Sequence, residues 1–169
     1  MDQGLRSGDE MARPRRIDGF SYSGFNRYFL TFCVKERDRT FVDGLIIIVA
    51  LEQFRKTAAL EQFSILTYCF MPDHVHLLVE GTCETSDLRR FAKLAKQRSG
   101  AAHALLGRGR LWQDGYYERV LRDEDASRDV ARYIVENPVR AGLVISPIDY
   151  PHVGSDMWTL AHILDDEMW

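Results

Sequence analysis

Two histidines separated by a single residue are the clearest candidates for chemistry in this sequence. They lie in the run 72–78, PDHVHLL, whose apolar residues favour a strand. Alternate residues of a strand point to the same face, so His74 and His76 would present two imidazoles side by side. Such a pair suits a divalent cation, with Asp73 as an outer partner of the site. The alternative interpretation is a pair of hydrogen-bonded surface histidines that bind no metal.

A tyrosine and an asparagine four residues apart form the second candidate. Tyr133 and Asn137 lie in the run 132–138, RYIVENP, and on a helix this spacing places them on one face. Val130 and Ile134 would form an adjacent apolar face that docks on a sheet. A phenol and an amide oxygen on one helical face could act as a nucleophile and a metal ligand. The alternative is a packing tyrosine and an asparagine that ends the helix before proline.

The elements that must position these residues alternate between strands and helices. Dense β-branched and aromatic residues predict strands over 27–34, 63–70, 75–80 and 111–121. A turn at 71–73 would join the second and third strands in a hairpin. Helices are predicted over 45–60 behind an N-cap at Asp43, from caps at 85–87 to about Leu106, and from a cap at Asp125 or Ser127 through Asn137. The order predicts an α+β, ferredoxin-like β-α-β-β-α-β antiparallel sheet, with an added C-terminal helix that carries the tyrosine.

Length and composition indicate one domain. The chain has 169 residues, of which 46% are hydrophobic and 28% charged, and these values argue against disorder, collagen and coiled coil. No apolar run approaches the ~20 residues that span a bilayer. The three cysteines lack Cys-x-x-Cys spacing, which favours a reducing cytoplasm over secretion. We expect a cytoplasmic domain over 19–148, between a flexible basic arm, 1–18, and an acidic C-terminal tail, 149–169.

The charge distribution indicates a phosphate-binding surface although the net charge is −3. The stretch from Arg89 to Arg119 holds eight Lys or Arg residues against two acids, and a basic stripe of this kind is typical of nucleic-acid binding. A merely solvated helix face is the alternative. Trp112 could stack on a base or lie buried in the core. The residues predicted to contact DNA are Arg15, Arg16, Arg89, Arg90, Lys93, Lys96, Gln97, Arg98, Trp112, Arg119 and Arg140.

Several motifs in fixed order together resemble one family. The runs MPDHVH at 71–76, LWQDG at 111–115 and YIVENPVRAG at 133–142 are similar to those of the REP-associated tyrosine transposases. This group belongs to the His-hydrophobic-His single-tyrosine transposases of small insertion sequences. The resemblance extends from about Arg15 to Gly154, and the family's fold is the same ferredoxin-like core.

The resemblance implies a metal-dependent enzyme that cleaves and rejoins single-stranded DNA. Tyr133 would attack a DNA phosphorus, leaving a 5′-phosphotyrosine and a free 3′-hydroxyl. His74 and His76 would bind Mg²⁺ or Mn²⁺ with Asn137 as third ligand, where related insertion-sequence enzymes carry Gln. The implied partners are single-stranded DNA and hairpins such as repetitive extragenic palindromes, and no membrane. Insertion-sequence relatives exchange the tyrosine helix within dimers, whereas the REP-associated group is able to act as monomers, so the sequence leaves monomer and homodimer open.

Three alternatives remain open at this point. Tyr116 and Tyr117 are rival nucleophiles, although neither has a partner of ligand type at helical spacing. A domesticated module could bind DNA hairpins without turnover, against which the presence of both histidines, Tyr133 and Asn137 argues. A small His-x-His metallohydrolase on an unrelated fold could use water as its nucleophile, and it would form no covalent adduct.

Overall fold

The computed structural model describes residues 17–165, and one five-stranded antiparallel sheet organises them. The strands follow the order β4-β1-β3-β2-β5 across the sheet, which confirms the ferredoxin-like arrangement. The strands are β1 (Arg27–Cys33), β2 (Phe63–Met71), β3 (His74–Gly81), β4 (Tyr117–Leu121) and β5 (Val153–Gly154). The α-helices are α1 (Gly44–Glu61), α2 (Leu88–Leu105), α3 (Glu124–Arg140) and α4 (Leu160–Leu164).

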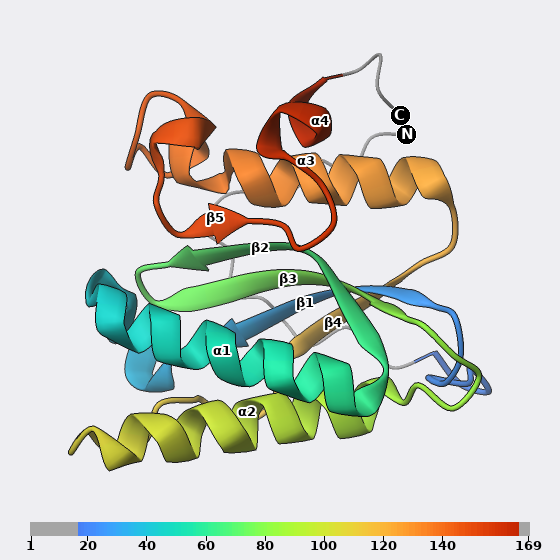
Figure 1. Cartoon of the computed structure of the whole chain (residues 1–169), viewed down its shortest axis with the longest axis horizontal. Coiled ribbons are helices and arrows are strands. Elements are labelled where there is room, and N and C mark those ends of the chain that lie inside the picture. The colour runs from blue at the N-terminus through green and yellow to red at the C-terminus, as the bar shows by residue number, and fades with distance from the viewer. Residues whose placement is uncertain (1–16, 166–169) are drawn as a thin grey trace.

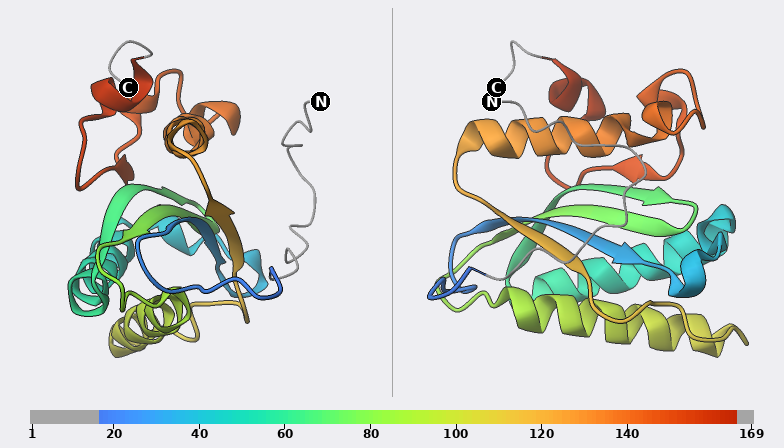
Figure 2. Two further views of the ribbon diagram at one scale, coloured as in Figure 1. Left: turned by 90° about the vertical axis from the view of Figure 1, so that its right-hand side faces the viewer. Right: turned by 180° about the vertical axis from the view of Figure 1, so that it is seen from behind.

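The sheet separates two layers of helices, as Figure 1 and Figure 2 show. Helices α1 and α2 cover one face, and α3 with α4 lies over the other. Residues of β1 alternate between the apolar cores on the two faces of the sheet. Leu30 and Phe32 join the core under α1 and α2, while Phe29 joins the core under α3. The strand that carries the two histidines, β3, is the middle strand of the sheet.

Capping side chains begin α1 and α2 where the sequence predicts. The Asp43 carboxylate accepts a hydrogen bond from the Leu45 amide, and Asp87 accepts one from the Arg90 amide. Helix α1 ends at Gln62, whose φ of 60° lies in the left-handed region. The buried residues of α2 recur at helical spacing, so one apolar stripe docks on the sheet and the basic side chains stay outside.

Helix α3 differs from the prediction at both ends. It begins behind Asp123, whose carboxylate accepts from the Ala126 amide, so the predicted caps Asp125 and Ser127 lie within the helix. It also continues through Pro138 to Arg140. The proline ring removes only one amide donor near the helix end, and the Asn137 carbonyl is still satisfied by the Ala141 amide. Because the helix does not stop at Asn137, Tyr133 and Asn137 keep a common helical face.

The predicted strand over 111–121 is shorter in the structure, and its tryptophan is a core residue. Only β4 pairs as a strand, whereas Trp112 forms an isolated bridge with Val34. The Trp112 indole is 5% exposed, packs against Phe32 and Phe54, and donates its N–H to Ser99 Oγ at 2.9 Å. The expectation that Trp112 contacts DNA is therefore corrected, because this indole presents no open face on which a base could stack.

The described part of the acidic C-terminal segment packs on the domain. Strand β5 pairs with β2, and the Tyr150 hydroxyl donates to the Phe70 carbonyl at 2.7 Å. Arg55 of α1 binds Asp156, and Ile163 of α4 is fully buried against the core under α3. The predicted boundary at residue 148 is therefore corrected, because residues 149–165 are part of the folded domain. Across residues 17–165, no helix is both long and apolar enough to span a membrane.

The buried position of Trp112 makes a prediction about stability. Trp112→Ala should lower the free energy of unfolding by about 3–5 kcal/mol, because it removes a large side chain from a packed core. Urea unfolding measures the change. The neighbouring Gln113→Ala, whose side chain is exposed, should stay within about 0.5 kcal/mol of the wild type. Equal stabilities of both variants would contradict the core assignment.

Candidate active site

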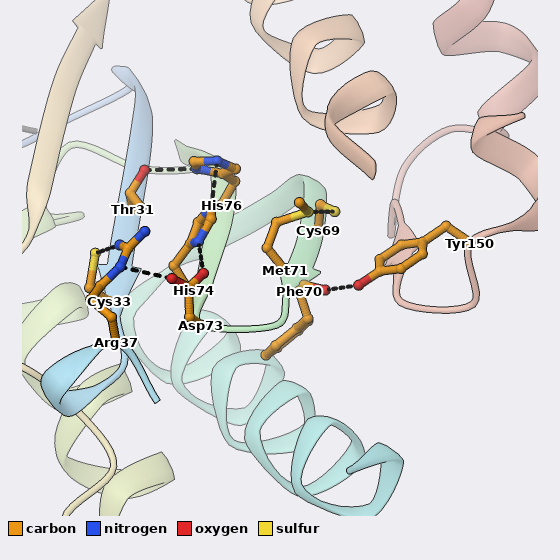
Figure 3. A network of polar contacts seen from close by, with 10 residues as sticks. All are labelled: Thr31, Cys33, Arg37, Cys69, Phe70, Met71, Asp73, His74, His76 and Tyr150. Carbon is orange, nitrogen blue, oxygen red and sulfur yellow. Dashed lines mark hydrogen bonds and ion pairs between the residues drawn. The ribbon is translucent and has the colours of Figure 1, made fainter. Parts of the chain in front are cut away.

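The two histidines of β3 face each other on the side of the sheet that α3 covers (Figure 3). Their Nε2 atoms are 3.1 Å apart, and their ring centroids are separated by 4.6 Å. His76 is only 3% exposed, whereas His74 is half-buried at the edge of the site. The predicted side-by-side pair is therefore confirmed, and its two convergent nitrogens have the arrangement that a shared cation requires.

A different polar group holds the second nitrogen of each ring. Asp73 Oδ1 lies 2.6 Å from His74 Nδ1, and Thr31 Oγ1 of β1 lies 2.8 Å from His76 Nδ1. The hydrogen bond to His74 is the main cause that lowers the pKa of the Asp73 carboxyl. An ionised carboxylate only accepts hydrogen bonds, so a neutral His74 carries its proton on Nδ1 and turns the lone pair of Nε2 toward His76.

Burial keeps His76 neutral. Desolvation by burial is the main cause that lowers the pKa of His76 well below 6.5. Because His74 Nε2 offers a lone pair, His76 donates from Nε2 and its Nδ1 accepts from the Thr31 hydroxyl. Both Nε2 atoms could hold a cation if the His76 proton were on Nδ1, where the Thr31 hydroxyl would accept it. The Thr31 hydroxyl can serve both states because it rotates freely between donor and acceptor.

The residues present fit a divalent cation that the protein holds through nitrogen. Two neutral imidazoles with outer hydrogen-bond partners are a typical protein contribution to a metal site. Among the described residues, no group of three His, Cys, Asp or Glu side chains is placed to hold a metal. Further ligands for a cation would be groups of another kind, such as the Asn137 amide, a substrate oxygen or water. No hydrogen bond in the described chain joins the Asn137 amide to either histidine, so its role as third ligand stays a prediction.

Helix α3 places the Tyr133 ring against His76, the buried member of this pair. The Tyr133 ring centroid lies 5.9 Å from that of His76 and 5.9 Å from that of Phe29. Arg140, two turns later, stacks its guanidinium 4.8 Å from the Tyr133 ring centre and binds Glu136 at 2.8 Å. One chain therefore brings together a phenol, two imidazoles and a cationic group, from α3 and β3.

The rival tyrosines lie on opposite faces of the sheet. Tyr116 packs on Phe32 in the core under α1 and α2, with ring centroids 5.7 Å apart. Tyr117 packs on Phe29, 5.9 Å away, on the same side as the histidines. Tyr117 is thus the structurally relevant rival to Tyr133, although it is Tyr133 whose ring packs against His76.

Comparison with known proteins identifies the family at this point. The family model "Transposase IS200 like" matches residues 26–137, a span that includes both histidines, Tyr133 and Asn137. The chain belongs to the IS200-like transposase family. A protein from Haemophilus influenzae described as a REP-associated tyrosine transposase is 24% identical over 137 residues, which cover 74% of this chain and 77% of that protein.

A solved structure shows the same fold. The structure of a REP-associated tyrosine transposase bound to a REP hairpin superposes with a TM-score of 0.68 at 21% identity, covering 85% of this chain and 82% of the other. The resemblance and the fold class expected from the sequence motifs are thereby confirmed. Membership of the IS200-like family makes this protein a DNA-processing enzyme of the transposase class.

The basic residues predicted for this transposase fall into two groups. Arg119 extends from β4 beside Phe29, and Arg140 stacks on Tyr133, so both lie on the side of the histidines. Helix α2 lies on the opposite face of the sheet. Lys96 there donates to the carbonyls of Gln113 and Gly115, and so holds the loop before β4. The other predicted α2 positions are exposed or half-exposed: Arg89, Arg90, Lys93, Gln97 and Arg98. Arg90 also pairs with Glu61 of α1. Arg15 and Arg16 lie outside the described residues.

Sequence patterns did not reveal two residues of this transposase site. Thr31 reaches His76 because β1 pairs with β3 in a register that sets these two residues opposite each other. Arg37 reaches Asp73 from the loop after β1, with Nε 2.8 Å from Asp73 Oδ2. Neither contact has a local spacing signal, because both join segments about 40 residues apart.

The buried, neutral His76 predicts a dependence of stability on pH. The unfolded chain takes up the histidine proton below about pH 6.5, whereas the folded state does not until a lower pH. The folded state is therefore favoured above pH 6.5 and loses up to about 1.4 kcal/mol per pH unit below it. Urea unfolding of the wild type and of His76→Gln between about pH 5 and 8 measures this loss, which should shrink in the variant.

His152 provides the matched control for this experiment. Burial also lowers the pKa of His152, but this side chain is only partly buried. His152→Gln should accordingly change the pH dependence less than His76→Gln does. Parallel curves for the wild type and His76→Gln would show that His76 is not the buried titrating group.

Proposed function

We propose that this transposase is a metal-dependent single-strand DNA endonuclease and strand transferase that cuts and rejoins DNA beside hairpins through a 5′-phosphotyrosine. The observation that carries the proposal is that the Tyr133 ring packs against His76, whose Nε2 lies 3.1 Å from that of His74, within one chain. The hairpin substrate is supported by the related REP-associated tyrosine transposase, whose structure contains a REP hairpin. The reaction would take place in the cytoplasm, where genomic DNA is available and free cysteines persist.

The histidine pair would hold Mg²⁺ or Mn²⁺, with Asn137 of α3 as third ligand. Nitrogen ligands favour Mn²⁺ over Mg²⁺, which prefers oxygen. The bound cation would polarise a non-bridging phosphate oxygen and orient the scissile bond. Asp73 and Thr31 would keep the two imidazoles aimed at the cation, since each holds the nitrogen that points away from it.

Tyr133 would carry out the covalent step. Its phenol oxygen forms a bond to phosphorus while the bond from phosphorus to the 3′-oxygen breaks, and the phenol proton is released as the 3′-oxygen becomes a hydroxyl. The phosphotyrosine linkage keeps the phosphodiester energy, so a 3′-hydroxyl can reverse the attack and rejoin DNA without ATP. The Arg140 guanidinium, which stacks on the Tyr133 ring, fixes the phenol and is placed to contact the incoming phosphates.

The arrangement of basic residues suggests a path for the DNA. Arg119 and Arg140 would bind phosphates of the cut strand beside the histidines, whereas the exposed basic side chains of α2 would bind a second segment, such as the paired stem, on the other face of the sheet. Arg15 and Arg16 would add contacts from the N-terminal arm. Because phenol and imidazoles meet within one chain, a monomer would suffice for cleavage.

The decisive test of the proposal is a substitution at the proposed nucleophile. Tyr133→Phe removes only a hydroxyl, so it should abolish cleavage and the SDS-resistant adduct to the 5′-phosphate while DNA affinity stays unchanged. Labelled single-stranded DNA with a palindromic hairpin from beside the protein's gene, incubated with Mn²⁺, serves as substrate on denaturing gels. The wild type in excess EDTA should give neither cleavage nor adduct.

The two rival tyrosines supply the controls. Tyr117→Phe, on the same side of the sheet, and Tyr116→Phe, on the other, should both keep the adduct. Cleavage without adduct in every protein would indicate a metallohydrolase that uses water, and binding without cleavage in the wild type would indicate a hairpin-binding module. Loss of the adduct in Tyr117→Phe alone would move the nucleophile to β4.

The proposed role of α2 predicts a change in the salt dependence of binding. Replacing both Arg89 and Lys93 by Gln should flatten the slope of log affinity against log salt by up to about two units, because each duplex phosphate contact contributes ~0.9. Fluorescence anisotropy with a labelled hairpin measures the slope. Lys56→Gln on neighbouring α1, an exposed lysine paired with Glu52, is the control and should leave it unchanged. An unchanged slope in the double variant would exclude α2 from the DNA path.

A further inference from the structure

We propose that Arg37 is a positioning residue of the metal site, which holds the Asp73 carboxylate so that His74 keeps its proton on Nδ1 and points Nε2 at the cation. This inference rests on the proposed function only for the identity of the cation. The chain of contacts is direct: Arg37 Nε lies 2.8 Å from Asp73 Oδ2, and Asp73 Oδ1 lies 2.6 Å from His74 Nδ1 (Figure 3). Each carboxylate oxygen thus has its own partner.

The guanidinium is itself held in place. Arg37 Nη1 donates to Cys33 Sγ at the end of β1, so two edges of the planar group are fixed at once. The loop that carries Arg37 is tied to the turn before β3, because the Val34 amide donates to the Asp73 carbonyl and the Phe41 amide donates to the Pro72 carbonyl. Arginine and carboxylate therefore belong to two segments that cannot move independently.

The backbone of the loop after β1 is strained at Arg37 and at the residue before it. Glu36 and Arg37 have φ of 56° and 58°, in the left-handed region that favours glycine. Among the described residues, the other non-glycine residue with positive φ is Gln62, which ends α1. Two adjacent strained residues persist only where surrounding contacts hold them, and such strain is typical of functional sites. Here the strained pair includes Arg37, which binds Asp73.

The direction in which Arg37→Gln changes the affinity for the cation distinguishes a positioning role of Arg37 from a purely electrostatic one. A cationic guanidinium near a divalent cation repels it, so the charge alone predicts tighter cation binding after Arg37→Gln. Positioning predicts the opposite, because a released Asp73 no longer selects the His74 tautomer that the cation needs. A third possibility is that Arg37 only contacts DNA, and it predicts no change in cation binding when DNA is absent.

The first readout is the tautomer of His74 without metal. Long-range ¹H–¹⁵N correlation spectra of the full-length protein, recorded at about pH 8 where ordinary imidazoles are neutral, should show His74 protonated on Nδ1 in the wild type. Arg37→Gln should convert this signature to a mixture of tautomers, and Asp73→Asn should do so more completely. Lys35→Gln removes the same charge from the same loop, where Lys35 pairs with Glu36, and should leave the spectrum unchanged.

The second readout is Mn²⁺ binding without DNA, measured from the electron paramagnetic resonance signal of free Mn²⁺. Arg37→Gln should weaken binding about threefold to tenfold, below the 10- to 100-fold typical of losing a direct outer partner such as Asp73. Arg37→Lys should recover part of the loss. Because Arg37 acts through Asp73, adding Arg37→Gln to Asp73→Asn should cause no further loss.

The two readouts separate failure of this inference from failure of the proposed function. A wild-type His74 tautomer in Arg37→Gln, or unchanged or tighter Mn²⁺ binding by that variant, would overturn the positioning role. Additive losses in the double variant would also overturn it, since Arg37 would then act independently of Asp73. A wild type that binds no Mn²⁺ at millimolar concentration would remove the metal from the proposed function, while the tautomer spectra would still decide the role of Arg37.

Discussion

The pairing register between β1 and β3 is the constraint on which the site depends. It sets Thr31 opposite His76 and Phe29 opposite Leu78, so one face of the sheet carries the imidazoles, their outer partner and the apolar seat for α3. A slip of one residue would turn every side chain to the other face. His76 would then lie in the core under α1 and α2 without Thr31, and no convergent pair would form.

The same register determines where α3 places Tyr133, the candidate nucleophile. Phe29 contacts His76, Tyr117 and Tyr133, and the buried residues of α3 pack on the face of the sheet that Phe29 shares. Docking of α3 therefore places Tyr133 over His76 through apolar packing, and no polar contact between the two side chains is needed. The Tyr133 ring is thus held by contacts with both Phe29 and the Arg140 guanidinium.

The site is also asymmetric in its electrostatics. His74 is held by the Asp73 carboxylate, which pairs with the Arg37 guanidinium, whereas His76 is buried and held by a neutral hydroxyl. The lowered pKa of His76 keeps its imidazole neutral, and the ionised Asp73 fixes the tautomer of the other. The two imidazoles are therefore held in place by different means. The basic side chains of α2 lie across the sheet from this site, so DNA that engages both must pass around an edge of the sheet.

The sequence by itself determined the order of elements, the shared face of His74 and His76, and the common helical face of Tyr133 and Asn137, because strand alternation and helical periodicity are local properties. It did not reveal that Trp112 is buried, that α3 continues through Pro138, or that residues 153–164 add a strand and a helix. Those outcomes depend on packing between distant segments, in which the burial of a side chain or a favourable contact overrides a local preference. Tertiary structure alone decided the roles of Thr31 and Arg37, since each meets its histidine or carboxylate only after β1 and β3 have paired.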